Sequence, residues 1–515
     1  MSRITIGKIM VSLLFGGLIL LRFADAFRPL NIASWRECDL GSIARNFAFE
    51  DADPLYPRVD WRGDGPGFAE MELPLYPYLT SITYRLFGFD DHYGRLWSFI
   101  FSIGSLIFFY KLARQYLDPL PAIVAFSFFG LNPLVVEVAT AVQPEGLMLM
   151  FYLGGVLFFL RWLREDRRAD LALAAVMTAM SLLAKASSAH IGLFFGILLF
   201  EKFGWSVFRR VDVYLFGLVT LVPAILWTTH AKGLYSTYGN SLGVSNEHHW
   251  IGWDFFTDSE FMAGILRSEF FYVWAGFGIV ALAFAVVRGY SGRPVRLSLL
   301  WLASVFVFYL LAARTTSQEW ASYYHVFSIA PVSLLFGSSL ARVRDHLRET
   351  ADKFSLRPLA ANIFRASLAI VVVICVLASL AVEGVQARRA LLNRRVPEPA
   401  FIWAEKVRPL LDRDGLIVVS GGNCHDKRGH QLAYNASYFF YWLERRGWNT
   451  CVERQSVAVI RSFAERGAEY FVAQHSMTQQ TAGFDAAVRR EYALLDETPE
   501  FSLYDLRRPA APDRP

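Results

Sequence analysis

The most informative part of the chain contains Trp35-Arg36-Glu37-Cys38-Asp39, followed by Ile43-Ala44-Arg45-Asn46-Phe47 and Glu70-Met71-Glu72-Leu73-Pro74-Leu75-Tyr76. These motifs fall within residues 28–93, directly after the first apolar segment. Acidic and Arg-containing loops placed against lipid are costly to keep unless they carry out chemistry at the membrane surface. The stretch therefore favours an enzyme that acts on a lipid-borne substrate over a channel or a scaffold.

Apolar segments surround this loop along the chain. Of the 515 residues, 54% are hydrophobic and only 19% are charged. Apolar runs of about 20 residues, the length that crosses a bilayer core, recur through the sequence. The pattern predicts a polytopic α-helical membrane protein, residues 1–383, with about eleven spanning helices. Their expected ranges are 8–27, 94–114, 119–138, 143–163, 170–184, 187–203, 211–230, 266–288, 295–314, 321–340 and 363–383.

Positive charge predicts the orientation of these helices. Lys and Arg gather in alternate loops, and cytoplasmic loops carry the excess of these residues. The N-terminus is therefore expected in the cytoplasm, with the 28–93 loop and the C-terminal region outside. Residues 9–21 followed by Ala24-Asp25-Ala26 also match a cleavable signal peptide, and either outcome leaves the loop outside. The net charge of +5 is interpreted as a topology signal, and no basic patch indicates nucleic-acid binding.

Two short helices are predicted inside the first outer loop. Leu40, Ile43, Ala44 and Phe47 follow one helix face, and a second run covers 75–86. Both runs are amphipathic and too short to span, so they are expected to lie in the membrane interface. Residues 51–68 are rich in Pro, Gly and Asp and indicate irregular loop.

A second outer loop is expected at 231–262, where aromatic residues are frequent. They suit either an aromatic belt or a sugar-binding rim. The adjacent His248 and His249 cannot share a helix face, which speaks against a metal site.

The C-terminal region, 384–515, has the composition of a soluble domain. Strand candidates near 415–420, 449–453, 469–474 and 501–507 alternate with helical patterns, which predicts a small α/β domain. Cys424 and Cys451 both fall here and could pair in an oxidising compartment. None of the four cysteines has metal-ligand spacing, so no structural zinc is predicted.

An outward-facing acid at the membrane could support transfer of a sugar from a lipid phosphate. The reaction needs a general base at the acceptor hydroxyl and cations that hold the departing phosphate. Asp39 is the candidate base, and it could also cap the following helix. Glu72 could meet Asp39 across the gap between the two short helices, although Glu37, Glu70 or Asp60 could take its place.

The same motifs resemble a known family. Trp35-x-x-x-Asp39, the segment 43–47 and Glu72-Leu73-Pro74-Leu75-Tyr76 are similar to the first outer loop of GT-C-fold glycosyltransferases. The similarity is greatest to the protein O-mannosyltransferase and aminoarabinose transferase group, glycosyltransferase families 39 and 83. The order of apolar segments, together with Gln143-Pro144-Glu145, where relatives often carry Arg-Pro-Asp, extends the similarity to about residue 340. The resemblance implies an inverting transferase that uses a polyprenyl-phosphate-linked sugar, with Asp39 as catalytic acid–base residue and Glu72 positioning the acceptor.

The chain departs from this group at Leu73, where relatives carry a cation before proline. Another cation must therefore hold the donor phosphate. Arg314 and Lys185 are the first candidates, because their short outer loops give them little other reason to be charged. Snorkelling to the headgroups would also explain them. The complete set of candidates is Arg314, Lys185, Arg58, His325, Arg267 and His92.

The acceptor stays open at this point: an envelope glycan, lipopolysaccharide or lipid A, or a protein hydroxyl. No cofactor is required by the expected reaction, and a divalent metal is not predicted. The expected location is a bacterial inner membrane with the C-terminal domain in the periplasm. Alternatives are a transporter or flippase of lipid-linked sugars, an O-antigen ligase or polymerase, and a non-catalytic assembly protein. Charges at helix ends and the absence of a repeat disfavour the transporter.

Overall fold

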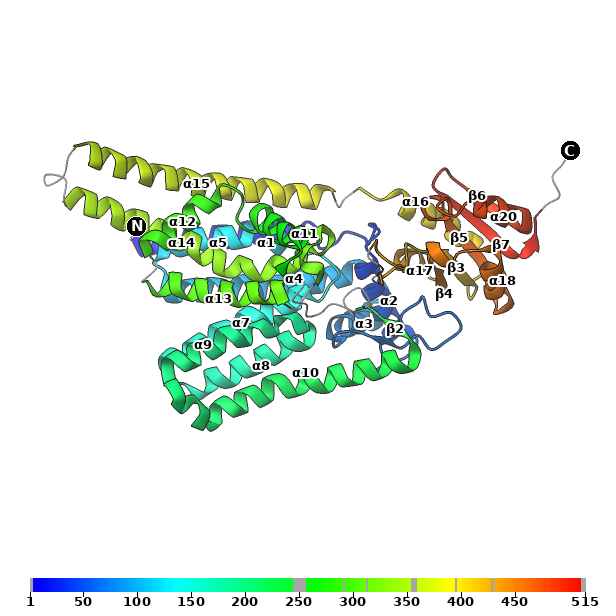
Figure 1. Ribbon diagram of the computed structural model, residues 1–515, viewed down its shortest axis with the longest axis horizontal. Coiled ribbons are helices and arrows are strands. Elements are labelled where there is room, and N and C mark those ends of the chain that lie inside the picture. Colours follow the sequence, from blue (N-terminus) through cyan, green and yellow to red (C-terminus); the bar gives the residue numbers. More distant parts are fainter. Residues whose placement is uncertain are drawn as a thin grey trace. The chain divides into compact units, whose positions relative to one another are not determined.

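The computed structural model describes residues 3–243, 256–289, 292–311, 314–352, 359–393, 396–427, 429 and 431–510. The chain divides into two compact units (Figure 1). The helical unit comprises Met1–Phe27, Arg95–Leu226 and His249–Asn393. The mixed unit comprises Arg28–Gly94, Trp227–His248 and Arg394–Pro515. The first outer loop thus belongs to the same unit as the C-terminal region.

Long apolar helices build the helical unit, and many of them run side by side (Figure 1). The helices are α1 (Arg3–Phe23), α4 (His92–Tyr116), α5 (Pro119–Leu131), α6 (Pro133–Val138), α7 (Glu145–Glu165), α8 (Arg168–Ala184), α9 (Ile191–Phe203), α10 (Val211–Tyr238), α11 (Ser259–Ser268), α12 (Gly278–Gly289), α13 (Arg293–Leu311), α14 (Val326–Asp352) and α15 (Leu359–Asn393). The first residues of α4 and the last turns of α10 extend into the mixed unit.

Seven helical segments within the described residues are long and apolar enough to cross a membrane, and a bent pair raises the number to eight. The bent pair joins Ser259–Val273 to Gly278–Arg288 at 94°. The expected span at 119–138 is interrupted, because Asn132 ends α5 and Pro133 begins α6. The structure therefore supports a multi-pass membrane protein, and the count of eleven stays a prediction.

The mixed unit contains both helices that the first loop predicts, α2 (Trp35–Phe49) and α3 (Leu75–Phe87). α3 is amphipathic and exposes Leu86 and Phe87. The expectation that α2 lies flat at the interface is wrong, because the protein buries most of it. A Cβ at Gly41 would lie 2.7 Å from the ring of Tyr441, so α2 packs closely against the C-terminal region.

A five-stranded sheet forms the centre of the C-terminal region, in the order β4-β3-β5-β7-β6. β3 pairs in parallel with β4 and β5, and β7 is antiparallel to β5 and β6. Val418, Ile460 and Phe471 are fully buried in its core. The strands are β3 (Leu416–Ser420), β4 (Gly447–Thr450), β5 (Ala468–Gln474), β6 (Tyr492–Glu497) and β7 (Phe501–Pro509). The helices are α16 (Pro399–Val407), α17 (Ser437–Leu443), α18 (Val457–Glu465), α19 (His475–Thr478) and α20 (Phe484–Glu491).

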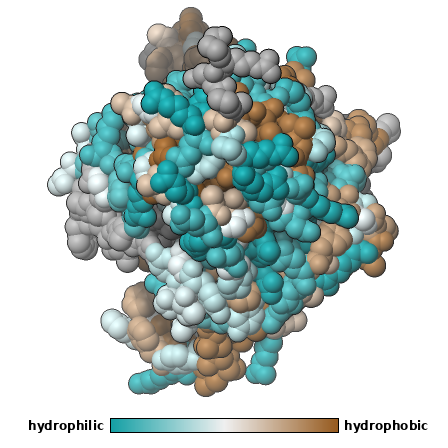
Figure 2. Space-filling view, turned by 90° about the vertical axis from the view of Figure 1, so that its right-hand side faces the viewer, coloured by the Kyte–Doolittle hydropathy of each residue, from teal (hydrophilic) through white to brown (hydrophobic). Residues whose placement is uncertain are grey.

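Loop segments also join distant parts of the mixed unit. β1 (Ala69–Glu70) pairs in parallel with β2 (Asn240–Ser241), which follows α10. Gly63 has φ +62° and lies so close to Trp448 that a Cβ would be 2.2 Å from the indole nitrogen. Glycine is required here, because it adopts a positive φ without strain and has no Cβ that would clash with the indole. Figure 2 looks onto the side of the five-stranded sheet and shows a mainly hydrophilic surface with separate hydrophobic areas.

Candidate active site

Asp39 lies in the first half of α2, which the sequence starts with a side-chain cap. Ser34 precedes the helix, and its hydroxyl oxygen accepts a hydrogen bond from the backbone N–H of Glu37. This cap satisfies one of the free N–H groups of the first turn, so Asp39 is not needed for capping. Asp39 is only 1% exposed. Its carboxylate oxygen Oδ1 accepts a hydrogen bond of 2.8 Å from Nε1 of Trp61.

The surroundings of Asp39 oppose its ionisation. Burial raises the pKa of this carboxyl to about 7, although the Trp61 hydrogen bond and the Arg36 guanidinium both act to lower it. The Asp60 carboxylate raises it further, and Ser437 lowers it. A base works best when its pKa lies near the working pH, because it is then both available and strong enough to accept a proton. Asp39 meets this condition.

Glu72 and Asp39 flank the same cation. The guanidinium of Arg36, one turn before Asp39 on α2, forms an ion pair with the Glu72 carboxylate. Arg36 also acts electrostatically on Asp39. The structure thus places both predicted acids around one arginine that the sequence analysis did not single out.

A second ion pair holds the loop that carries Trp61. Asp60 is 3% exposed and accepts hydrogen bonds from Arg45 at 2.6 Å and from the Asn46 side chain at 2.8 Å. Arg45 also donates to the backbone oxygen of Tyr441. Burial acts to lower the pKa of Arg45, but Asp60 raises it above its usual value. Asp60, the residue before Trp61, is therefore held by Arg45 and Asn46, and the choice between Glu72 and Asp60 as the second acid stays a prediction.

The two phosphate-binding candidates in the mixed unit are already paired with carboxylates. Arg58 lies 2.7 Å from Asp51 and 3.5 Å from Glu50. His92 lies 2.5 Å from Asp90. These ion pairs are partly exposed, so they contribute little to stability and satisfy much of the charge of each cation.

Lys185 has the most site-like surroundings of the candidates in the helical unit. It follows α8 and forms an ion pair with Glu145, whose side chain is 1% exposed. Its ammonium nitrogen lies 4.4 Å from the ring centre of Tyr323 and 4.7 Å from that of Tyr324. Aromatic faces stabilise a cation at such distances. Glu145 belongs to the Gln143-Pro144-Glu145 motif, so the motif and the candidate cation are joined.

The other candidates differ in accessibility. His325 is fully buried, with Nδ1 2.7 Å from Glu269 and Nε2 2.8 Å from the backbone oxygen of Thr316. Arg267 is exposed in the last turn of α11 and has no ion-pair partner among the described residues. Arg314 begins a short 3₁₀ turn, and its side chain lies outside the described residues. His248 and His249 also lie outside them.

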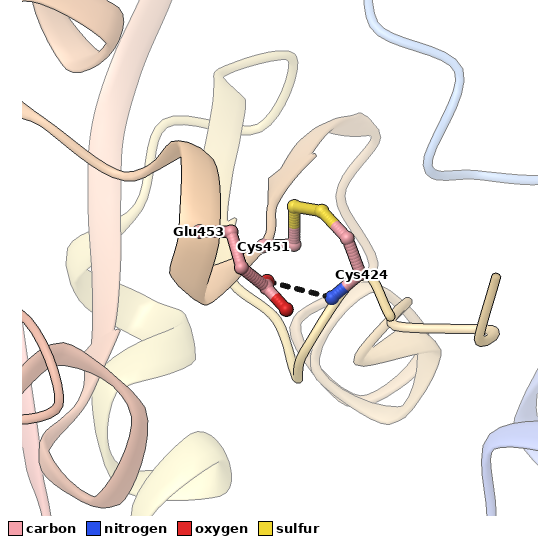
Figure 3. Close-up of side chains that lie close together, drawn as sticks. All are labelled: Cys424, Cys451 and Glu453. Atoms are coloured by element: carbon pink, nitrogen blue, oxygen red, sulfur yellow. Dashed lines mark hydrogen bonds between the residues drawn. A yellow bond between two sulfur atoms is a disulfide. The ribbon is translucent and has the colours of Figure 1, made fainter. Parts of the chain in front are cut away.

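Cys424 and Cys451 form a disulfide (Figure 3). The Glu453 carboxylate lies beside it and accepts a hydrogen bond of 2.7 Å from the backbone N–H of Cys424. Within the described residues this is the only cluster of His, Cys, Asp and Glu with metal-like spacing. A disulfide offers no thiolate, so the cluster does not fit a zinc site.

Sequence reasoning missed Trp61 and Ser437 as neighbours of Asp39. Ser437 begins α17 and donates a hydrogen bond of 2.7 Å to the backbone oxygen of Trp35. No local pattern connects residues that are about 400 positions apart. For Trp61 the sequence offered only a weak indication, a large aromatic residue within a loop rich in Pro, Gly and Asp.

Comparison with known proteins identifies similar folds and one matching family. Residues 66–228 match the family described as dolichyl-phosphate-mannose-protein mannosyltransferase. A comparison with curated protein sequences finds no match. ArnT from Cupriavidus metallidurans is similar in structure in the apo state, with a TM-score of 0.66 and 14% identity over 98% of this chain and 99% of that chain. Its complex with undecaprenyl phosphate gives a TM-score of 0.65 and 16% identity over the same shares.

A more distant similarity links the chain to the archaeal oligosaccharyltransferase AglB from Archaeoglobus fulgidus, whose structure holds an inhibitory peptide and a dolichol-phosphate. The TM-score is 0.50, with 11% identity over 95% of this chain and 73% of that one. The GT-C fold inferred from the loop motifs is thereby confirmed. The fold and the family match together support a multi-pass membrane glycosyltransferase.

Proposed function

We propose that this protein is an inverting glycosyltransferase that moves a sugar from a polyprenyl-phosphate donor to a hydroxyl group outside the cytoplasm. The observation that carries the proposal is the Asp39 carboxyl, buried at the start of α2 with a pKa of about 7. The similarity to a transferase solved with undecaprenyl phosphate supports the choice of donor. The acceptor belongs to the cell envelope: a glycan, a lipid A-type lipid or a protein side chain.

In the proposed reaction, Asp39 accepts the proton of the acceptor hydroxyl. The acceptor oxygen forms a bond to the anomeric carbon of the sugar, and the bond from that carbon to the phosphate oxygen breaks. The phosphate leaves on its lipid with the bonding electrons. Trp61 orients the base through Oδ1, and Arg36 keeps Glu72 and Asp39 in place. General base catalysis of this kind contributes about 10²–10⁴-fold to a rate.

The departing phosphate needs positive charge, and we assign this role first to Lys185. An ammonium group provides three N–H donors, and that of Lys185 lies beside Glu145 and two tyrosine rings. Arg267 and Arg314 stay predictions for the same role. His325 is a weaker candidate, because both of its ring nitrogens are engaged.

We further propose that the protein resides in a bacterial inner membrane, with its N-terminus in the cytoplasm and the mixed unit in the periplasm. The Cys424–Cys451 disulfide supports this orientation, since such bonds persist in oxidising compartments. Labelling of a cysteine introduced at Asp53, an exposed residue of the same loop, with a membrane-impermeant reagent tests the orientation. Labelling only after the membrane is permeabilised to the cytoplasm would refute it.

The function is tested by deleting the gene and restoring it with variants. Loss of the protein should cause one polyprenyl-phosphate sugar to accumulate and the same sugar to disappear from one envelope glycan, as measured by mass spectrometry. Asp39→Asn should fail to restore the glycan, because an amide cannot accept the proton. Asp53→Asn, which changes an exposed carboxylate in the same loop, should restore it. Full restoration by Asp39→Asn would overturn the assignment of the base.

A further inference from the structure

A cavity of about 420 Å³ lies within the mixed unit. Its lining comes from the first outer loop, from the end of α10 with β2, and from the C-terminal region, where residues 424–425, 431–435, 448–449, 454 and 466 contribute. The volume is in the range of pockets that enclose a small ligand. It is too large for a packing defect, which in protein interiors rarely exceeds the size of a water molecule.

The charge of the cavity is positive. Arg62, Arg454 and Arg466 line it, and no Asp or Glu does so among the described residues. Arg62 pairs with Glu50 and Arg466 with Asp64. Arg454 is exposed and has no ion-pair partner in the part of the chain that the structure describes. An arginine without a carboxylate beside it is suited to bind an anion with two parallel hydrogen bonds.

The rest of the lining suits a saccharide. Trp61, Tyr434 and Trp448 provide aromatic surface, onto which the C–H face of a sugar ring can pack. Side-chain amides at Asn240, Gln431, Asn435 and Asn449 also line the cavity. An amide offers both donors and acceptors, as the hydroxyl groups of a sugar require. The Asn240 side chain already donates to the backbone oxygen of Phe68, and Asn449 Oδ1 accepts from the backbone N–H of Ala436. A peptide or lipid tail would have less use for so many amides.

Trp61 connects the cavity to the base. Its ring lines the cavity, while its Nε1 donates the hydrogen bond to Asp39. A ligand in the cavity is therefore separated from the carboxyl by one indole ring. A ligand group in the cavity would therefore not touch the Asp39 carboxyl. It would be a part of the acceptor that binds to the protein but does not react.

Part of the cavity lining is cross-linked to the end of the neighbouring strand. The disulfide ties Cys424 to Cys451, directly after β4. Glu453 accepts hydrogen bonds from the backbone N–H groups of Cys424 and His425. A wall that is ordered before binding lowers the entropy lost when a ligand binds.

We propose that this cavity binds the non-reacting part of the acceptor, and that this part is a saccharide carrying a carboxylate or phosphate group. The proposal rests on the transferase function given above, and it narrows the acceptor to an anionic glycan. Arg454 would contact the anion, and the aromatic and amide side chains would contact the sugar rings.

Binding is measured with the full-length protein in nanodiscs of zwitterionic lipid, by saturation-transfer NMR titration. The probes are trigalacturonate, pentamannose 6-phosphate, the neutral maltotriose and hexaglutamate. At least one anionic saccharide should bind about tenfold more tightly than maltotriose and hexaglutamate, and which of the two does so identifies the anion. Arg454→Glu should weaken that binding roughly tenfold, as expected for a lost hydrogen bond to a charged group.

Three controls distinguish a failure of the binding proposal from a failure of the proposed transferase function. Arg490→Glu reverses an exposed arginine on α20, away from the cavity, and should leave binding unchanged. Arg454→Lys should retain part of the affinity, and all variants should melt at the temperature of the unaltered protein. Asp39→Asn should bind the saccharide normally while losing transfer. A failure of the transferase function alone would leave the binding data intact.

Equal binding of maltotriose and the anionic saccharides would overturn the proposal. Binding of hexaglutamate as tight as that of the saccharides would also overturn it, since the cavity would then recognise an acidic peptide. Equal effects of Arg454→Glu and Arg490→Glu on binding would overturn it as well.

Discussion

Replacing Trp61 with phenylalanine should shift the pH dependence of the enzyme to higher pH. The change removes the Nε1–H donor that contacts Asp39 Oδ1 at 2.8 Å and keeps an aromatic ring in place. This hydrogen bond favours the ionised carboxylate and thereby lowers the pKa of Asp39. Without it, the pKa should rise above its value of about 7. A base must be ionised to act, so the acid limb of the activity profile should move upward.

The size of the shift follows from the strength of the bond. A hydrogen bond to a charged group contributes about 1.5–3 kcal/mol. One pKa unit corresponds to about 1.36 kcal/mol, so a rise of roughly one unit is expected if water replaces part of the bond. At pH 7 the ionised fraction would fall from about one half to about one tenth, and activity would fall about fivefold. Above about pH 9 the variant should approach the activity of the unaltered protein.

The assay is the pH profile of kcat/KM between about pH 5.5 and 9.5, measured in nanodiscs with a polyprenyl-phosphate sugar. Trp205→Phe is the matched control, because Trp205 is 77% exposed in the helical unit and should leave the profile unchanged. An acid limb that stays in place, or moves to lower pH, would refute the role of Trp61. Activity lost equally at every pH would indicate damage to the fold.

Further predictions concern the neighbours of this bond and the disulfide. Arg36→Gln removes a cation that lowers the pKa of Asp39, so the acid limb should again rise; an unchanged limb in the same assay would contradict this. Asp60→Asn leaves the Arg45 charge without its buried partner and should destabilise the mixed unit by roughly 3–5 kcal/mol. The melting temperature of the Asp60→Asn variant, followed by circular dichroism, should therefore be lower than that of the unaltered protein. Cys451→Ser opens the loop of 27 residues and should cost about 2–4 kcal/mol, with dithiothreitol giving no further loss in this variant.

Local patterns in the sequence predict many of the helices and strands. The apolar runs predict a multi-pass protein, and the 3.6-residue pattern near Leu40 and Leu79 predicts α2 and α3. The strand expected at 415–420 is β3. Each of these predictions depends on residues within one or two turns of each other. β6 and α20 were not predicted.

The environment of Asp39 could not be predicted in the same way. α2 has too many polar residues to suggest burial, yet Asp39 and Asn46 are buried because partners elsewhere satisfy them. Those partners, Trp61 and Asp60, lie in irregular loop, which has no period to interpret. The motif therefore predicts Asp39 as the base, but the pKa of its carboxyl depends on tertiary contacts.

The packing of α17 on α2 has a consequence for biosynthesis. Ser437 and Tyr441, which contact the α2 segment, emerge from the ribosome about 400 residues after it. Until they arrive, α2 lacks the hydrogen bond from Ser437 and the packing of the Tyr441 ring against Gly41. The surroundings of α2 are therefore complete only when translation is nearly finished.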